Sequence, residues 1–157
     1  MMSYVALFLA GWIAGLLGEY ALHWLMHERP LMFHIYHHRE FFYEEPKQIA
    51  KNTIEIDMNL RGFFDLLAVA APLGLVVGWE PLLLVWGGAF WHLVIVYEGC
   101  HALIHYDALL PKFVTRSRLF QWWKGCHFEH HQSSPTKNYC ITCPLVDWVF
   151  RTYKHPA

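Results

Sequence analysis

The stretch YVALFLAGWIAGLLGEYALHWLM, Tyr4 to Met26, decides the fold class of this chain. At about 1.5 Å per residue, a helix of this length crosses a hydrocarbon core of about 30 Å. Its only acidic residue is Glu19. A cleaved signal peptide would have a basic start and a small-residue cleavage site, and neither accompanies this run. We therefore expect a membrane-spanning helix that stays in the mature protein.

A second apolar region, residues 63–105, is too long for one span and contains the turn signal GWEP at Gly78 to Pro81. It predicts a helical hairpin. The whole chain is 55% hydrophobic, well above what a soluble domain needs. We expect a single all-α domain over residues 1–157, an integral membrane helical bundle of about three spans, near residues 4–27, 62–78 and 82–105.

The basic residues predict which side of the membrane each segment occupies. All twelve Lys and Arg residues fall between positions 29 and 61 or between positions 112 and 154. By the positive-inside rule, segments 28–61 and 106–157 are cytoplasmic and the N-terminus is outside. A net charge of −1 and the lack of a basic tail argue against nucleic acid as a partner.

Histidines form four spaced groups: HWLMH, HIYHH, HALIH and HFEHH. Residues four apart on a helix share a face, so each group can present two or three imidazoles together. The predicted topology brings all four groups to the cytoplasmic face. Ten imidazoles exceed what one ion can bind, so two metal ions are the economical interpretation. The ten residues are His23, His27, His34, His37, His38, His101, His105, His127, His130 and His131.

Two acids accompany the histidine pairs. Glu19 precedes His23 by four residues, and Glu98 precedes His101 by three. A metal-bound imidazole usually donates its other N–H to a carboxylate or carbonyl, so both acids are candidates for that supporting role. Each could equally pair with another nearby donor. Outside the pattern, His92 and His155 are interpreted as interfacial side chains without a ligand role.

Other chemistries lack their motifs. No H-E-x-x-H is present, so a zincin peptidase is excluded. Cys140 and Cys143 form a C-x-x-C without the second pair that a structural zinc site needs. The four cysteines lie at or beyond the predicted inner surface, where thiols stay reduced. Metal chemistry and metal handling remain.

In their order and spacing, the four histidine motifs resemble the fatty acid hydroxylase superfamily, which includes sterol desaturases and is related to carotene hydroxylases. The tail NYCITCPLVDWVFRTY resembles the ending of that family, although Cys140 and Arg151 stand where glycine is usual. The resemblance implies a cytoplasmic helical cap above the bundle, in which these histidines hold two iron ions. It also places Asn138 and Asp147 near the site as hydrogen-bonding support. Zinc can replace iron in purified protein, since imidazole suits both.

The resemblance implies an O2-dependent oxidoreductase that hydroxylates or desaturates an unactivated C–H bond of a membrane lipid. No catalytic residue beyond the metal ligands is then required. Electrons would come from a separate ferredoxin or cytochrome with its reductase, because the chain has no flavin or nicotinamide motif. The alternative is a histidine-rich metal-binding or transport protein without oxygenase activity. The lipid, the carbon attacked and the choice between hydroxylation and desaturation stay open.

Overall fold

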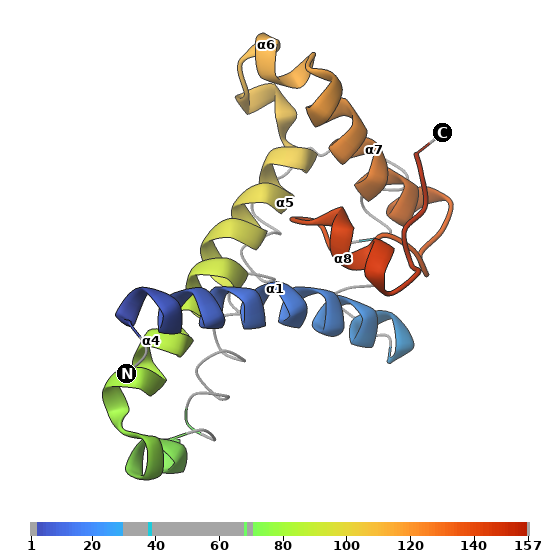
Figure 1. The fold of residues 1–157 in the computed structure, drawn as a ribbon. Helices are drawn as coiled ribbons and strands as arrows, with labels where there is room; N and C mark the ends of the chain where they lie inside the picture. Colours follow the sequence, from blue (N-terminus) through green and yellow to red (C-terminus); the bar gives the residue numbers. More distant parts are fainter. Residues whose placement is uncertain (1–2, 30–37, 39–67, 69–70, 157) are drawn as a thin grey trace.

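The structure is a computed structural model that describes residues 3–29, 38, 68 and 71–156 (Figure 1). Within these residues the regular structure is entirely helical, which confirms the predicted all-α class for this part of the chain. The elements are α1 (Tyr4–Glu28), α4 (Trp79–Phe90), the π-helix η2 (Trp91–Tyr97), α5 (Glu98–His105), the 3₁₀ turn η3 (Asp107–Leu109), α6 (Lys112–Thr115), α7 (Arg118–Gln132) and α8 (Pro144–Val149).

Helix α1 begins at an N-cap, Ser3, whose side chain accepts a hydrogen bond from the Ala6 N–H. The residues that α1 buries are spaced four apart and therefore lie along one face: Gly11, Gly15, Glu19 and His23. Along this face the buried residues change from glycine, at Gly11 and Gly15, to polar side chains, at Glu19 and His23. The glycine end allows close helix packing, and the polar end contributes side chains to the candidate site.

Helices α4, η2 and α5 follow one another without a break as one long helix from Trp79 to His105. Gly78 precedes it at φ 93°, a conformation that favours glycine. The sequence predicts a span beginning near Leu82, but the helix begins at Trp79. Pro81 is tolerated in the first turn of the helix, because the N–H that proline lacks would have no partner within the helix there. Of the expected GWEP turn, only Gly78 is non-helical, and Trp79 to Pro81 belong to the helix.

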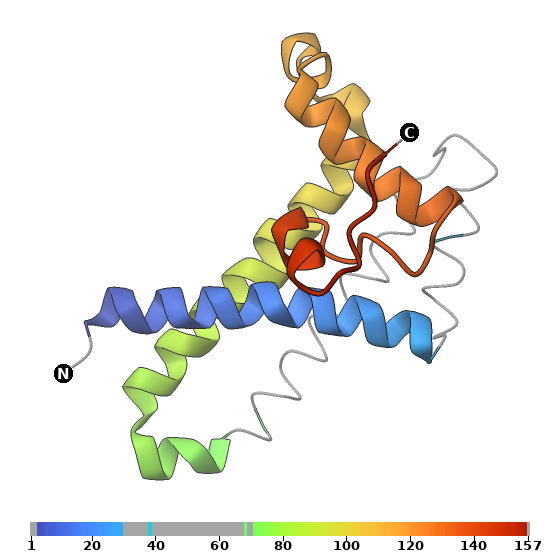
Figure 2. The same ribbon diagram turned by 45° about the vertical axis from the view of Figure 1, so that its right-hand side comes forward.

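The first helix crosses the long helix at a wide angle, as both views show (Figures 1 and 2). Glycine makes the crossing close. A Cβ on Gly11 would lie 1.9 Å from the Val85 carbonyl oxygen, and one on Gly88 would lie 2.0 Å from that of Phe8. Small residues at such crossings are typical of helices that pack within a membrane.

Within the described part of the chain, two helices are long and apolar enough to cross a membrane, Tyr4–Glu28 and Trp79–His105. Only 17% and 22% of their most apolar windows are buried, whereas a core helix of a soluble protein is mostly buried. Most of their apolar surface is therefore available to lipid. Of the expected span at 62–78, residues 62–67, 69 and 70 lie outside the described residues, and residues 71–77 are helical. The count of three spans therefore stays a prediction.

The C-terminal part folds back over the helices that precede it. Helix α7 starts at the N-cap Ser117 and diverges from α5, and α8 lies between α7 and α1 (Figure 2). A small core of Tyr97, Ile104 and Ile141 joins the long helix to the segment before α8. This arrangement brings α1, α5 and α7 to one place, with residues 137–142 packed among them.

Candidate metal centre

Eight of the ten predicted histidine ligands come together in two groups of four. We call His23, His27, His38 and His130 the α1 cluster, and His101, His105, His127 and His131 the α5 cluster. Within each cluster the candidate ligand atoms all lie within 4.8 Å of one another. His34 and His37 lie outside the described residues, and their ligand role stays a prediction.

Helix α7 contributes to both clusters. His127 and His131 are four residues apart and join the α5 cluster, whereas His130 joins the α1 cluster. The H-x-x-H-H motif therefore does not present its three rings to one ion, as its spacing alone would allow. It divides them: His130 Nε2 lies 3.0 Å from His27 Nε2 of α1, whereas His127 Nε2 lies 2.8 Å from His105 Nε2 of α5.

The distances between ring nitrogens fit a shared metal ion in each cluster. In the α1 cluster, His27 Nε2 lies 3.0 Å from His130 Nε2. In the α5 cluster, His105 Nε2 lies 3.1 Å from His101 Nε2 and 2.8 Å from His127 Nε2. Two nitrogens bound to one ion at right angles, each about 2.1 Å from it, are about 3.0 Å apart. The donor sets thus have the spacing that metal ligation requires.

Backbone carbonyls fix the orientation of two rings in the α1 cluster. His23 Nδ1 lies 2.6 Å from the Tyr139 carbonyl oxygen, and His130 Nδ1 lies 2.6 Å from that of Lys137. A carbonyl can only accept, so each Nδ1 carries the hydrogen and donates it. The lone pair of each ring is therefore on Nε2, the atom left to bind metal.

Burial keeps the imidazoles neutral, as ligation requires. All four members of the α5 cluster are buried. In the α1 cluster, His23 and His130 are buried and His27 and His38 are half-buried. Burial, reinforced by the neighbouring His27 and His101 rings, lowers the pKa of His38 to about 3. At neutral pH the His38 ring is therefore neutral and keeps a lone pair for a metal ion.

Asn138 and Asp147 organise residues 137–142, which carry the two carbonyls. The fully buried Asp147 carboxylate accepts the N–H groups of Tyr139 and Cys140, each at 2.8 Å, and the Thr152 hydroxyl at 2.8 Å. Asn138, at φ 55°, donates from Nδ2 to the Cys126 carbonyl at 3.0 Å. Both side chains thus hold the backbone whose carbonyls contact His23 and His130, and their role in a metal centre stays a prediction.

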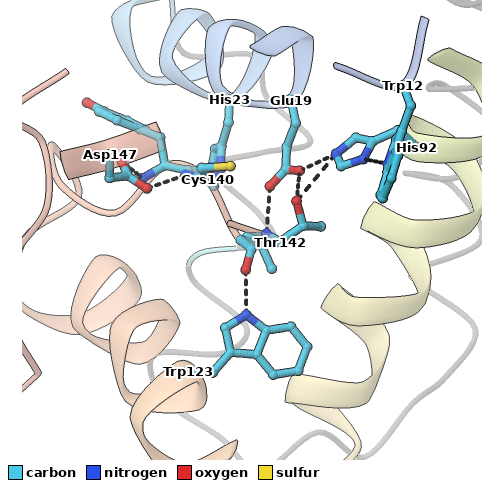
Figure 3. Close-up of polar contacts among 10 residues, drawn as sticks. Trp12, Glu19, His23, His92, Trp123, Cys140, Thr142 and Asp147 are labelled. Carbon is cyan, nitrogen blue, oxygen red and sulfur yellow. Dashed lines mark hydrogen bonds and ion pairs between the residues drawn. The ribbon is translucent and has the colours of Figure 1, made fainter. Parts of the chain in front are cut away.

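The two acids of the spans are both buried. Glu19 accepts hydrogen bonds from His92, at 2.8 Å, and from Thr142 (Figure 3). Glu98 lies in the first turn of α5, before His101 and His105. From the sequence, Glu19 could either accept from a metal-bound histidine or pair with another donor. The structure shows the second arrangement, with His92 and Thr142 as the donors. Its connection to the α1 cluster therefore runs through the protein backbone.

The interpretation of His92 as an interfacial side chain is wrong. His92 is 2% exposed and lies between Trp12, which donates to its Nδ1 at 2.8 Å, and Glu19. Its position depends on η2, where the wider π-helical turn alters the angles that a uniform α-helix would give. Single π segments occur frequently at functional sites, but the sequence gives no signal for one.

The cysteines show no disulfide among the described residues, where Cys100, Cys126, Cys140 and Cys143 are all free. Burial raises the pKa of Cys126 to about 11, and burial together with the Glu19 charge raises that of Cys140 above its ordinary range. Neither thiol belongs to a histidine cluster.

The family model for fatty acid hydroxylases matches this chain over residues 8–152. The chain belongs to the fatty acid hydroxylase family. The match includes both histidine clusters and the tail segment, and it confirms the resemblance drawn from the four motifs. Neither the comparison with curated proteins nor that with solved structures finds a match. The family and the site together indicate a lipid hydroxylase type of function.

Proposed function

We propose that this fatty acid hydroxylase family member is a membrane-bound, O2-dependent di-iron oxidoreductase that hydroxylates or desaturates a C–H bond of a membrane lipid. The observation that carries the proposal is the pair of adjacent four-histidine clusters, built on helices that also expose apolar surface. The substrate would be a fatty acyl chain, a sterol or a carotenoid.

The donor set fits iron, which imidazole binds well, and zinc would be held by the same ligands in purified protein. Eight neutral imidazoles bring no negative charge to two dications. Three acids, Glu19, Glu98 and Asp147, are also buried in the chain. When bound, the iron pair would supply reductive activation of O2 and the removal of hydrogen from an alkyl carbon.

The chain's own residues would bind the ions, exclude water and admit the lipid. All four members of the α5 cluster are buried, and they lie on two helices, α5 and α7. His27 and His38 are half-buried, so the α1 cluster is the more accessible of the two. Large apolar side chains on α1, such as Leu17, Trp24 and Leu25, are exposed and suit lateral contact with lipid.

The remaining parts of the proposal concern orientation and the source of electrons. The basic residues favour a cytoplasmic location for the site and the C-terminus, with the N-terminus outside. A ferredoxin or a cytochrome with its reductase would deliver electrons from that side. Exposed basic residues such as Lys112, Arg118 and Arg151 would attract an acidic carrier.

Metal binding or transport without oxygenase activity is the alternative. A transport path needs polar groups along the spans. In the described part of the long helix, Glu80 lies in the first turn and His92 near the middle, where it is paired with Glu19, and the histidine ligands gather at the other end. This distribution favours a fixed centre.

The test compares lipids from iron-supplemented cells that express the wild-type chain or the His101→Ala, His130→Ala double variant, which removes one ligand from each cluster. Mass spectrometry of the extracted lipids should show a product with one added oxygen or two fewer hydrogens in the wild type alone. Equal product in both cell lines would refute the enzyme. Metal uptake by wild-type vesicles with no lipid product would favour transport.

A further inference from the structure

A chain of buried hydrogen bonds links the membrane helices to the C-terminal segment. The Trp12 indole N–H donates to His92 Nδ1 at 2.8 Å, and His92 Nε2 lies 2.8 Å from Glu19 Oε2. Thr142 reaches the same carboxylate twice, from its N–H to Oε1 at 2.9 Å and from its hydroxyl to Oε2 at 2.5 Å (Figure 3). These four residues come from α1, η2 and the segment before α8.

The direction of each hydrogen bond is fixed by chemistry. An indole N–H can only donate, so His92 Nδ1 accepts and the ring hydrogen lies on Nε2. That hydrogen is donated to Glu19. The Glu19 carboxyl group accepts from the His92 ring and from the N–H and hydroxyl of Thr142, and the Cys140 thiol also hydrogen-bonds to it. A buried acid within a spanning helix rarely lacks partners.

This chain of bonds does not deliver protons. It ends at Trp12, whose indole is 42% exposed and has no acceptor or titratable proton at neutral pH. The bonds instead hold Glu19 in one orientation, with both oxygens directed at Thr142. Their effect is therefore to fix the position of Thr142.

Thr142 ends the segment that supports the α1 cluster. Within residues 137–142, the Lys137 and Tyr139 carbonyls accept from His130 and His23. Contacts with α7 hold the other side of this segment, since Asn138 Nδ2 donates to Cys126 O and Trp123 Nε1 donates to Ile141 O. The bonds of Thr142 to Glu19 therefore fix the segment to α1, the helix that carries His23 and His27.

The α5 cluster is built differently. Its four ligands lie on two helices, α5 and α7, and follow i, i+4 spacing on both. No residue of the 137–142 segment is among its ligands. The segment meets the α5 helix through apolar packing of Ile141 on Ile104, whereas in the α1 cluster its carbonyls hold the ligand rings by hydrogen bonds.

We propose that Glu19 and His92 are positioning residues that act through Thr142 to assemble the α1 cluster alone, so that the two metal sites differ in their dependence on the C-terminal segment. This inference rests on the two-metal centre of the proposed function. Loss of a hydrogen-bonding partner directly behind a ligand typically weakens metal binding by about 10-fold to 100-fold. Because Thr142 acts one step further away, we expect about 10-fold.

The experiment uses single-site backgrounds of the full chain, freed of metal with a chelator and titrated in detergent with Co²⁺ alone. His101→Ala removes a ligand from the α5 cluster, and His27→Ala removes one from the α1 cluster. Thr142→Val, which deletes the hydroxyl, should weaken Co²⁺ binding about 10-fold in the His101→Ala background and leave it unchanged in the His27→Ala background. Co²⁺ absorption bands report ligand geometry directly, independently of activity.

Three further variants sharpen the comparison. Thr142→Ser keeps the hydroxyl and should bind Co²⁺ as the parent does. Thr136→Val makes the same chemical change at an exposed position of the same tail and should have no effect. Glu19→Gln directs an amide NH2 at donors and should reproduce the Thr142→Val result.

Each outcome decides the inference. Equal weakening in both backgrounds would show a general structural role and overturn it, as would no weakening in either. Loss of binding by Thr142→Ser would also overturn it, because the hydroxyl would not be the cause. A wild-type chain that binds fewer than two ions would refute the metal centre itself, a result distinct from failure of the positioning role.

Discussion

Replacing Asp147 tests how strongly the C-terminal segment depends on one buried carboxylate. Asp147 is fully buried and accepts two backbone N–H groups and one hydroxyl. The Asp147→Ala variant would leave the N–H groups of Tyr139 and Cys140 buried without this acceptor. Each such loss costs about 1–3 kcal/mol, so the variant should be less stable by about 2–6 kcal/mol.

That cost is large beside a typical free energy of unfolding of about 5–15 kcal/mol. Asp147→Asn keeps one acceptor oxygen and should lose about 1–3 kcal/mol. Asp107→Asn is the matched control. Asp107 pairs with Lys124 at a partly exposed site, and such pairs contribute about 0–1 kcal/mol.

Thermal and denaturant unfolding of the metal-free chain in detergent would measure these differences. The expected order of stability is wild type and Asp107→Asn, then Asp147→Asn, then Asp147→Ala. A destabilisation by Asp147→Ala no greater than that of Asp107→Asn would refute the reasoning, since it would show that neither N–H group depends on the carboxylate.

The difference in stability between the wild type and Asp147→Asn should depend on pH with a predictable sign. Burial raises the pKa of Asp147, although its hydrogen bonds oppose the shift. A raised pKa in the folded state means that the wild type loses stability as pH rises through that pKa. Asp147→Asn has no such group, so the gap between the two proteins should narrow with rising pH in the metal-free state, and a gap that widens would contradict this.

Two other predictions concern packing and thiol chemistry. Gly88→Ala places a Cβ against the backbone of α1 and should lower the unfolding temperature strongly, whereas Gly87→Ala, which meets nothing within 4 Å, should be neutral or stabilise by up to about 1 kcal/mol. Equal effects of the two variants would mean that the helices do not cross so closely. Cys140 is buried with a raised pKa, so iodoacetamide at neutral pH should modify it, by mass spectrometry, only after unfolding.

The sequence predicts the metal centre well where ligand spacing alone determines geometry. His101 and His105 share one helical face, as do His127 and His131, and the structure brings these pairs together. The division of the last motif was not predictable, because it depends on the tertiary position of α7, which places His130 beside His27 of α1.

The supporting contacts were harder to predict for a physical reason. The groups that orient His23 and His130 are backbone carbonyls, which every residue has and no sequence pattern reveals. The pairing of His92 with Glu19 joins positions 73 residues apart and depends on a π-helix. Asn138 and Asp147 were located through the family resemblance, and only the structure shows what they hold.

Metal stoichiometry tests the central claim most directly. Elemental analysis of purified protein from iron-supplemented cells should give about two ions per chain, counting iron and zinc together. His27→Ala and His105→Ala each remove a ligand from a different cluster, and each should leave about one ion. Fewer than two ions in the wild type, or two in both variants, would contradict a centre built from two four-histidine clusters.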